Sequence, residues 1–200
     1  MESEKFKKWI NDIRRATEIL REQSIEEVCV VYHDDADGVT AAAILKAALE
    51  REHIKVKLIC IEKLYLEVVE KLHNEEGKVY IYADIAAPHA QKISNINRGR
   101  NLTIILDHHN AVPSTDPAVI NLDPELYGFS GEEEASGATV CYFFSKVLSE
   151  RNVDLAHLAV IGASEIPGPV RGLNLVPLED AVKVGTVQVK QYGEAKKYLI

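Results

Sequence analysis

The sequence predicts an α/β fold: a parallel sheet of about five strands, flanked by helices on both faces and preceded by an N-terminal amphipathic helix. Short apolar segments alternate with helix-like segments through residues 28–122. Strands that are connected by helices usually lie parallel in one sheet. The apolar segments are nearly continuous, which is typical of strands that are buried on both faces.

The individual elements follow from apolar spacing. Residues 4–22 carry apolar side chains at helical spacing and predict the N-terminal helix. We expect strands at residues 28–32, 55–60, 78–84, 101–106 and 118–122. Helices are expected between them at residues 38–52, 63–73 and 88–97, the last opened by Pro88, which is favoured in a first turn. Two more helices are expected at residues 136–150 and 154–163, after a loop rich in Gly, Ser and acidic residues.

The chain divides into three expected parts. Residues 1–24 form the N-terminal helix, residues 25–180 the main domain, and residues 181–200 the start of a linker or of a further domain. Three prolines and two glycines in residues 164–180 exclude regular structure throughout that segment. The last twenty residues show weak alternation and then a helix-like end. We therefore expect the chain to be part of a longer protein.

Composition excludes several classes of protein. The formal net charge of −8 leaves no broad basic surface for gripping a long nucleic acid by its backbone. No apolar run approaches the roughly 18 residues of a membrane span, and no signal-peptide pattern opens the chain, so a cytoplasmic protein is expected. Cys29, Cys60 and Cys141 stand singly in apolar runs and are expected to be buried, without disulfides or zinc.

Charged side chains follow three of the predicted strands. The carboxyl ends of neighbouring parallel strands converge at one edge of a sheet, where ligands bind. The residues placed there are His33, Asp35 and Asp37 after the first strand, Asp84 after the third, and Asp107, His108 and His109 after the fourth. We therefore expect these side chains to form one cluster.

A divalent cation would explain this clustering. Buried carboxylates that face one another repel and are expensive to desolvate. Carboxylate oxygens with imidazole nitrogens suit Mn²⁺, with Mg²⁺, Co²⁺ or Zn²⁺ as competitors. Five or six candidate ligands exceed one tetrahedral site, and they favour two ions that share a carboxylate. Each piece also has an alternative: Asp37 as a helix N-cap, Asp84 as a turn residue, and the two histidines as a surface loop.

The other polar residues carry weaker signals. His53, His73, His89 and His157 lack acidic neighbours at ligand spacing and are interpreted as surface or helix-end residues. The acidic run at residues 132–134 is expected to be solvated or to open a helix. No glycine-rich phosphate loop of the GxGxxG or GxxxxGK[ST] type occurs.

Three of these segments together resemble a known family. "HDDADG" (33–38), "AD" (83–84) and "DHHN" (107–110) each follow an apolar strand. In order and spacing they resemble the first three motifs of the DHH phosphoesterase superfamily, over about residues 26–163. The compact first motif is most similar to that of archaeal RecJ-like nucleases.

The resemblance implies a function and a role for each residue. It implies two Mn²⁺ ions, with Mg²⁺ or Co²⁺ as substitutes, and hydrolysis of phosphodiester or phosphoanhydride bonds. Asp35 and Asp37 would bind separate ions, His33 and His108 would be further ligands, and Asp84 would bridge the ions. His109 would point elsewhere, to meet the substrate phosphate or act as an acid, and Asp107 would hold one of the imidazoles.

The fourth motif departs from the family pattern. Family members usually place a ligand Asp in a stretch like "GAxGD", whereas this chain reads "IGASEIPG" (161–168). Glu165 stands one position early and is the candidate replacement. The superfamily also includes relatives that lost catalysis and act as scaffolds in replication complexes.

The expected function is that of a metal-dependent single-strand-specific exonuclease or oligonucleotide-degrading nuclease in DNA repair or replication. Its expected partners are single-stranded DNA or RNA, short oligonucleotides and a replication or repair protein. Two alternatives stay open: a non-catalytic replication or repair partner, and a small-molecule phosphohydrolase acting on pyrophosphate or cyclic dinucleotides.

Overall fold

A five-stranded parallel sheet forms the centre of the molecule. The computed structural model describes residues 3–23, 25–192 and 195–200. The strand order is β2-β1-β3-β4-β5, and every neighbouring pair is parallel. The strands are β1 (Glu27–His33), β2 (Lys55–Ile61), β3 (Val79–Ala83), β4 (Leu102–Leu106) and β5 (Val119–Asn121). The predicted fold class is confirmed, and each strand ends within one residue of its predicted limits.

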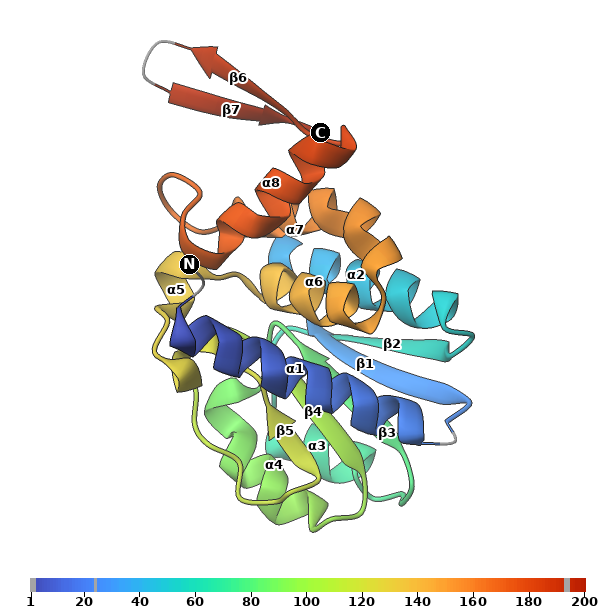
Figure 1. Ribbon diagram of the computed structural model, residues 1–200. Coiled ribbons are helices and arrows are strands. Elements are labelled where there is room, and N and C mark those ends of the chain that lie inside the picture. Colours follow the sequence, from blue (N-terminus) through green and yellow to red (C-terminus); the bar gives the residue numbers. More distant parts are fainter. Residues whose placement is uncertain (1–2, 24, 193–194) are drawn as a thin grey trace.

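Helices cover both faces of this sheet (Figure 1). The first face carries α1 (Glu4–Glu22), α2 (Ala36–Arg51), α6 (Gly137–Leu148) and α7 (Ala156–Ala163), and the second carries α3 (Leu66–Leu72) and α4 (Ala90–Asn97). Successive strand residues point to opposite faces. Val30 and Ile104 accordingly join the first core, while Val31 and Ile105 join the second.

The N-terminal helix α1 forms as predicted and belongs to the first layer. Ser3 caps it by accepting a hydrogen bond from the backbone N–H of Phe6. Trp9 and Leu20 are fully buried on its inner face, and Trp9 Nε1 donates to the carbonyl of Leu122 at 2.7 Å. This hydrogen bond ties α1 to the end of β5.

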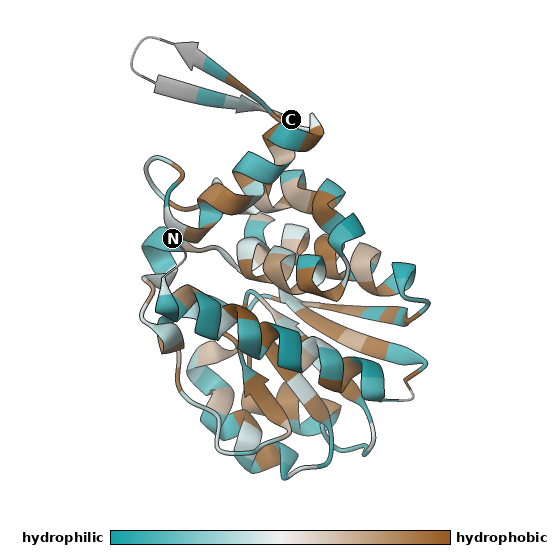
Figure 2. Ribbon diagram, viewed as in Figure 1, coloured by the Kyte–Doolittle hydropathy of each residue, from teal (hydrophilic) through white to brown (hydrophobic). Residues whose placement is uncertain are grey.

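Apolar residues concentrate on the strands and on the inward sides of the helices, as Figure 2 shows. The exposed side of α1 is more hydrophilic in the same view. Among the helices in the described part of the chain, none is both long and apolar enough to cross a membrane.

Short elements and a hairpin complete the chain. These are η1 (Ala87–His89), η2 (Pro124–Tyr127), α5 (Gly131–Glu134), η3 (Glu150–Leu155), η4 (Gly172–Asn174), α8 (Leu175–Val184), β6 (Gln188–Tyr192) and β7 (Ala195–Leu199). β6 and β7 pair antiparallel and project beyond α8 (Figure 1). The expectation of a helix-like end was wrong, because pairing with β6 decides the conformation of β7 and local spacing does not report such pairing.

The helix predicted at residues 63–73 is shorter than expected. Tyr65 is its extended N-cap, so α3 begins at Leu66 and residues 62–65 form a loop after β2. This loop lies at the same edge of the sheet as the ends of β1 and β3, because all three strands are parallel neighbours.

One expectation about a single side chain was wrong. Cys60 is exposed, because β2 is an edge strand, whereas Cys29 and Cys141 are buried as expected. His73 lies at a helix end, as one of its two interpretations had it, because it is the C-cap of α3; it is fully buried there. Its Nδ1 lies 2.9 Å from Asn97 Oδ1 and its Nε2 lies 3.1 Å from the Tyr82 hydroxyl, so both ring nitrogens have partners.

Candidate metal centre

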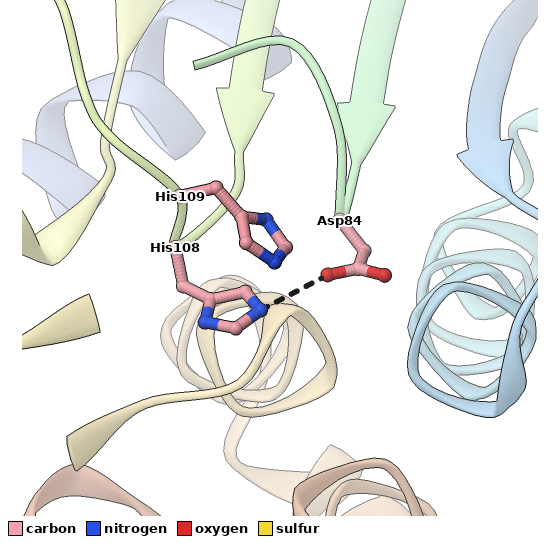
Figure 3. A group of neighbouring side chains, drawn as sticks. All are labelled: Asp84, His108 and His109. Carbon is pink, nitrogen blue, oxygen red and sulfur yellow. Dashed lines mark ion pairs between the residues drawn. The ribbon is translucent and has the colours of Figure 1, made fainter. Parts of the chain in front are cut away.

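The ends of three adjacent strands bring the predicted acidic and histidine residues together. β1, β3 and β4 are neighbours in the sheet, so the residues that follow them meet at one edge. His108 Nε2 lies 3.4 Å from Asp84 Oδ1 and 3.6 Å from Asp37 Oδ2, and Figure 3 shows His108 directed at Asp84.

The hydrogen bond on the other nitrogen of His108 determines what faces these carboxylates. His108 Nδ1 lies 3.0 Å from the carbonyl oxygen of Gly131, and a carbonyl can only accept a hydrogen bond. Nδ1 therefore carries the proton in the neutral ring, and Nε2 presents a lone pair to Asp84 and Asp37. Three acceptors that face one another repel unless a proton or a cation lies between them.

Asp37 is held by the N-terminus of α6. Its two carboxylate oxygens accept hydrogen bonds from the backbone N–H groups of Gly137 at 2.7 Å and Ala138 at 2.8 Å. The side chain is buried, and burial raises the pKa of its carboxyl although these bonds and His108 lower it. The alternative in which Asp37 caps its own helix was wrong, because Asp35 is the N-cap of α2.

Asp84 is the buried residue whose environment most requires a cation. Neither of its carboxylate oxygens has a hydrogen-bond partner among the described residues. Burial, followed by the charges of Asp37, Asp107 and Asp35, raises the pKa of Asp84 to about 10. A buried carboxyl without partners destabilises a fold. A divalent ion bound by both oxygens would satisfy them, so these residues fit a metal centre.

A second, more open group lies on the other side of Asp84. His33 Nδ1 lies 2.6 Å from Asp35 Oδ2 and 3.8 Å from Asp84 Oδ2. The other oxygen of Asp35 accepts from the backbone N–H of Gly38 at 2.8 Å and so caps α2. Burial raises the pKa of Asp35, but the bond from Gly38 and the contact with His33 lower it on balance.

Asp107 supports both histidines of the DHH segment. Its Oδ1 accepts from the backbone N–H of His108 at 2.8 Å and from Nδ1 of His109 at 2.7 Å. Its Oδ2 accepts from the backbone N–H of Ala87 at 2.7 Å. Burial lowers the pKa of His109, but the bond to Asp107 raises it above its ordinary value on balance. Asp107 thus orients the imidazole of His109 and holds the backbone of His108.

His109 lies closer to the cluster than the sequence predicted. Its ring centroid is 3.7 Å from that of His108, and both rings lie near Asp84 (Figure 3). The expectation that His109 points elsewhere was wrong, because its bond to Asp107 turns the ring back toward its neighbour.

Two sets of potential ligand atoms result, and they share one residue. In each set the ligand atoms lie within 4.8 Å of one another: Asp84, His108 and His109 in one, and His33, Asp35 and Asp84 in the other. Mixed carboxylate and imidazole donors suit first-row divalent ions. The position of Asp84 in both sets is the geometry that a bridging carboxylate requires.

Glu165 lies at the same end of α2 but is in neither set. Its Oε1 accepts a hydrogen bond from the backbone N–H of Ala36 at 3.0 Å. The carboxylate of Glu165 therefore contacts the first residue of α2, Ala36, which follows the capping Asp35.

Sequence reasoning missed the backbone groups and glycines that complete the centre. A Cβ on Gly137 would lie 2.4 Å from Asp84 Oδ1, and one on Gly162 would lie 2.4 Å from Asp37 Oδ1. Only glycine leaves room for these carboxylates. A local signal existed for Gly137, because Ser136 precedes it as the N-cap of α6. The contact of Gly162 has no local signal.

Comparisons with known proteins agree with this architecture. The model of the DHH family N-terminal domain matches residues 27–163. An uncharacterized protein of Methanocaldococcus jannaschii is 28% identical over 190 residues, covering 90% of this chain and 43% of that protein. The chain thus spans less than half the length of this curated relative.

Solved structures show the same fold. Exonuclease RecJ bound to manganese matches with a TM-score of 0.69 and 22% identity, over 86% of this chain and 47% of that one. RecJ of Thermus thermophilus in complex with Mn²⁺ matches with a TM-score of 0.68 and 22% identity, over 86% of this chain and 26% of that one. CDC45 of Entamoeba histolytica matches with a TM-score of 0.60 and 13% identity, over 91% of this chain and 38% of that one. At these identities the likeness concerns the fold.

Proposed function

The chain belongs to the DHH family, and from that premise we propose that it is a divalent-metal-dependent phosphoesterase with two ions in its centre. The observation that carries the proposal is Asp84. It is buried, both its oxygens lack hydrogen-bond partners among the described residues, and it belongs to both sets of candidate ligands.

The ligands divide between the two ions. Asp37, Asp84 and His108 would hold the first ion, and His33, Asp35 and Asp84 the second. His109 also belongs to the first set of ligand atoms, but we assign it to proton transfer. Mn²⁺ is the proposed ion, with Mg²⁺ or Co²⁺ as substitutes, because the donors are carboxylates and imidazoles. The fold neighbour RecJ carries manganese in its crystal structure, which supports this choice.

The residues around the ions would position the reaction. Divalent ions in such a pair lower the pKa of a water molecule and neutralise charge on phosphoryl oxygens. Asp107 holds the Nδ1 proton of His109 and favours the imidazolium form of its ring. In that form Nε2 also carries a proton, which it would pass to the leaving oxygen. The neutral tautomer of His108, set by Gly131, keeps its Nε2 lone pair available as a ligand.

We propose single-stranded DNA or RNA ends and short oligonucleotides as substrates. The neighbour RecJ is an exonuclease by name, which supports this class. The net charge of −8 indicates that a long strand would need a grip outside this domain. We propose residues 25–180 as the catalytic domain, with α8 continuing to Val184.

A non-catalytic replication or repair partner is the second candidate. The position of Glu165 favours it, because the only acid near the fourth motif hydrogen-bonds Ala36 and joins neither ligand set. The fold shared with CDC45 is compatible with either candidate.

Labelled substrates test the proposal. The protein is incubated with 5′- and 3′-labelled single-stranded DNA and RNA and with Mn²⁺, and Asp84→Asn serves as the control. We expect the wild type to shorten a strand only with metal, and Asp84→Asn to leave it intact. Phosphate release from pyrophosphate without shortening would instead indicate a small-molecule enzyme. Inertness toward all of these, together with binding to a replication or repair protein, would replace the proposal by the second candidate.

A further inference from the structure

A cleft of about 280 Å³ opens beside the half-exposed side of the centre. Its floor includes His33, Asp35 and Asp84. One wall is the loop after β2, with Glu62, Lys63 and Leu64, and the other is the segment after β3, with Ile85, Pro88 and His89. The floor and both walls thus lie at one edge of the sheet.

We propose that this cleft is the subsite for one nucleotide unit of the substrate, with its phosphate over the floor and its base between the two walls. The inference rests on the proposed function, because it names the part of the substrate that the phosphoesterase would hold. It assigns Lys63 to the phosphate and Leu64, Ile85 and Pro88 to the base.

The walls have the chemistry of a base-binding surface. Leu64 and Ile85 pack against the second core cluster, which fixes them, and Pro88 is exposed at the start of η1. The faces of a base are largely apolar, so aliphatic side chains can cover them and gain from the apolar surface that is buried. An inorganic phosphate or pyrophosphate would leave these apolar side chains without contact, so the walls favour a ligand with a base.

The rim of the cleft carries one ammonium group. Lys63 is exposed, and in the described part of the chain no carboxylate forms an ion pair with it. Glu62 beside it also lines the cleft, and its oxygens can accept hydrogen bonds from sugar hydroxyls. A lysine available opposite an acidic floor is suited to a phosphate that the ions also contact.

The second wall is held in a strained conformation. Asp84 and Ala86 have positive φ values of 58° and 98°, which non-glycine residues rarely adopt. The bond from the backbone N–H of Ala87 to Asp107 fixes this segment. It presents His89 to the cleft, with a buried Nδ1 that has no hydrogen-bond partner among the described residues. Strain retained next to the ligand residues indicates a wall that is formed before the substrate binds.

The volume sets the size of the ligand. Pockets for small molecules usually start at about 300 Å³, so a cleft of about 280 Å³ accommodates one nucleotide unit and not several. The remaining strand would lie outside the cleft, in accordance with the acidic net charge of the chain.

Equilibrium binding separates the base from the phosphate. Calorimetry on the protein with Mn²⁺ compares 2′-deoxyadenosine 5′-monophosphate with 2-deoxyribose 5-phosphate. We expect the nucleotide to bind about tenfold more tightly, because the base buries apolar surface against the walls. Pro88→Ser should remove most of this preference without weakening binding of the sugar phosphate, and Lys63→Ala should weaken both ligands about fivefold.

Matched controls keep the test decisive. Lys71→Ala changes an exposed lysine on α3 that does not line the cleft, and it should leave both affinities unchanged. Equal affinities for the two ligands, no binding of either, or no effect of Pro88→Ser and Lys63→Ala would overturn the subsite. A preference for the nucleotide in a protein that cleaves no strand would remove the proposed function and leave the subsite standing. Cleavage without the preference would do the reverse.

Discussion

The two halves of the candidate centre differ in how the fold holds them. In the buried half, Asp37 and His108 each have a second contact that fixes them: the N-terminus of α6 and the Gly131 carbonyl. In the open half, His33 and Asp35 are about one-third exposed, and Asp35 also caps a helix. The open half therefore has a purely structural explanation, whereas the buried half, with the partnerless Asp84, has none. A cation explains the buried half.

The largest expected effect is a difference in Mn²⁺ affinity between variants of the buried half and of the open half. His108→Ala should weaken the tighter Mn²⁺ site by about 100-fold, because it removes a buried, preoriented ligand. His33→Ala should weaken the other site and leave the tighter site within about threefold. Calorimetric titration with Mn²⁺ measures both. Equal losses at both sites in the two variants would show that the halves are equivalent.

The second effect concerns pH in the metal-free protein. The pKa of Asp84 is raised to about 10 in the folded protein, so the folded state keeps a proton that the unfolded chain releases above about pH 4. The contribution of protonated Asp84 to the free energy of unfolding is therefore fully present below about pH 4. It is lost as the pH rises from about 4 toward 10, by up to about 1.4 kcal/mol per pH unit.

Urea unfolding in EDTA at several pH values between 5 and 9 measures this slope. In Asp84→Asn the slope should become shallower, because the amide does not titrate. Burial and Asp107 also raise the pKa of Asp123, to about 8, so a smaller slope of the same sign should remain. An identical slope in the variant would contradict the assignment to Asp84.

A smaller effect tests the capping role in the open half. Asp35→Ala should lower the free energy of unfolding of the metal-free protein by about 1 kcal/mol, the usual loss for a helix N-cap. Asp35→Ser, which can still cap α2, should recover most of it while failing to restore the second Mn²⁺ site. Thermal unfolding with and without Mn²⁺ distinguishes the two losses. Recovery of the metal site by Ser would indicate that Asp35 is no ligand.

The smallest effect is expected at Glu165. Glu165→Gln keeps an oxygen that accepts from the backbone N–H of Ala36, so stability should change by less than about 0.5 kcal/mol and Mn²⁺ affinity by less than about threefold. The result is compared with Glu165→Ala, which loses the bond. A tenfold loss of Mn²⁺ affinity in Glu165→Gln alone would make Glu165 a ligand after all.

The sheet was predictable because strands buried on both faces leave uninterrupted apolar runs, and the charged residues after them mark the strand ends. The hairpin of β6 and β7 was not, since pairing is non-local. The same limit applies within the site. The positions of Asp84 and His108 followed from strand ends, but the turn of His109 toward His108 depends on Asp107, and the fit of Asp37 depends on Gly162. Such contacts form only in the folded chain.

The most direct test of the shared carboxylate is the number of ions bound. Wild type and Asp84→Asn are titrated with Mn²⁺ by calorimetry, after circular dichroism has shown that the variant is folded. The wild type should bind two ions. Asp84→Asn should lose measurable binding at both sites. It should also be more stable than the wild type in EDTA near neutral pH, because a neutral amide replaces a carboxyl whose charge is disfavoured by burial and by neighbouring carboxylates. Two ions bound by Asp84→Asn with wild-type affinity would contradict the account.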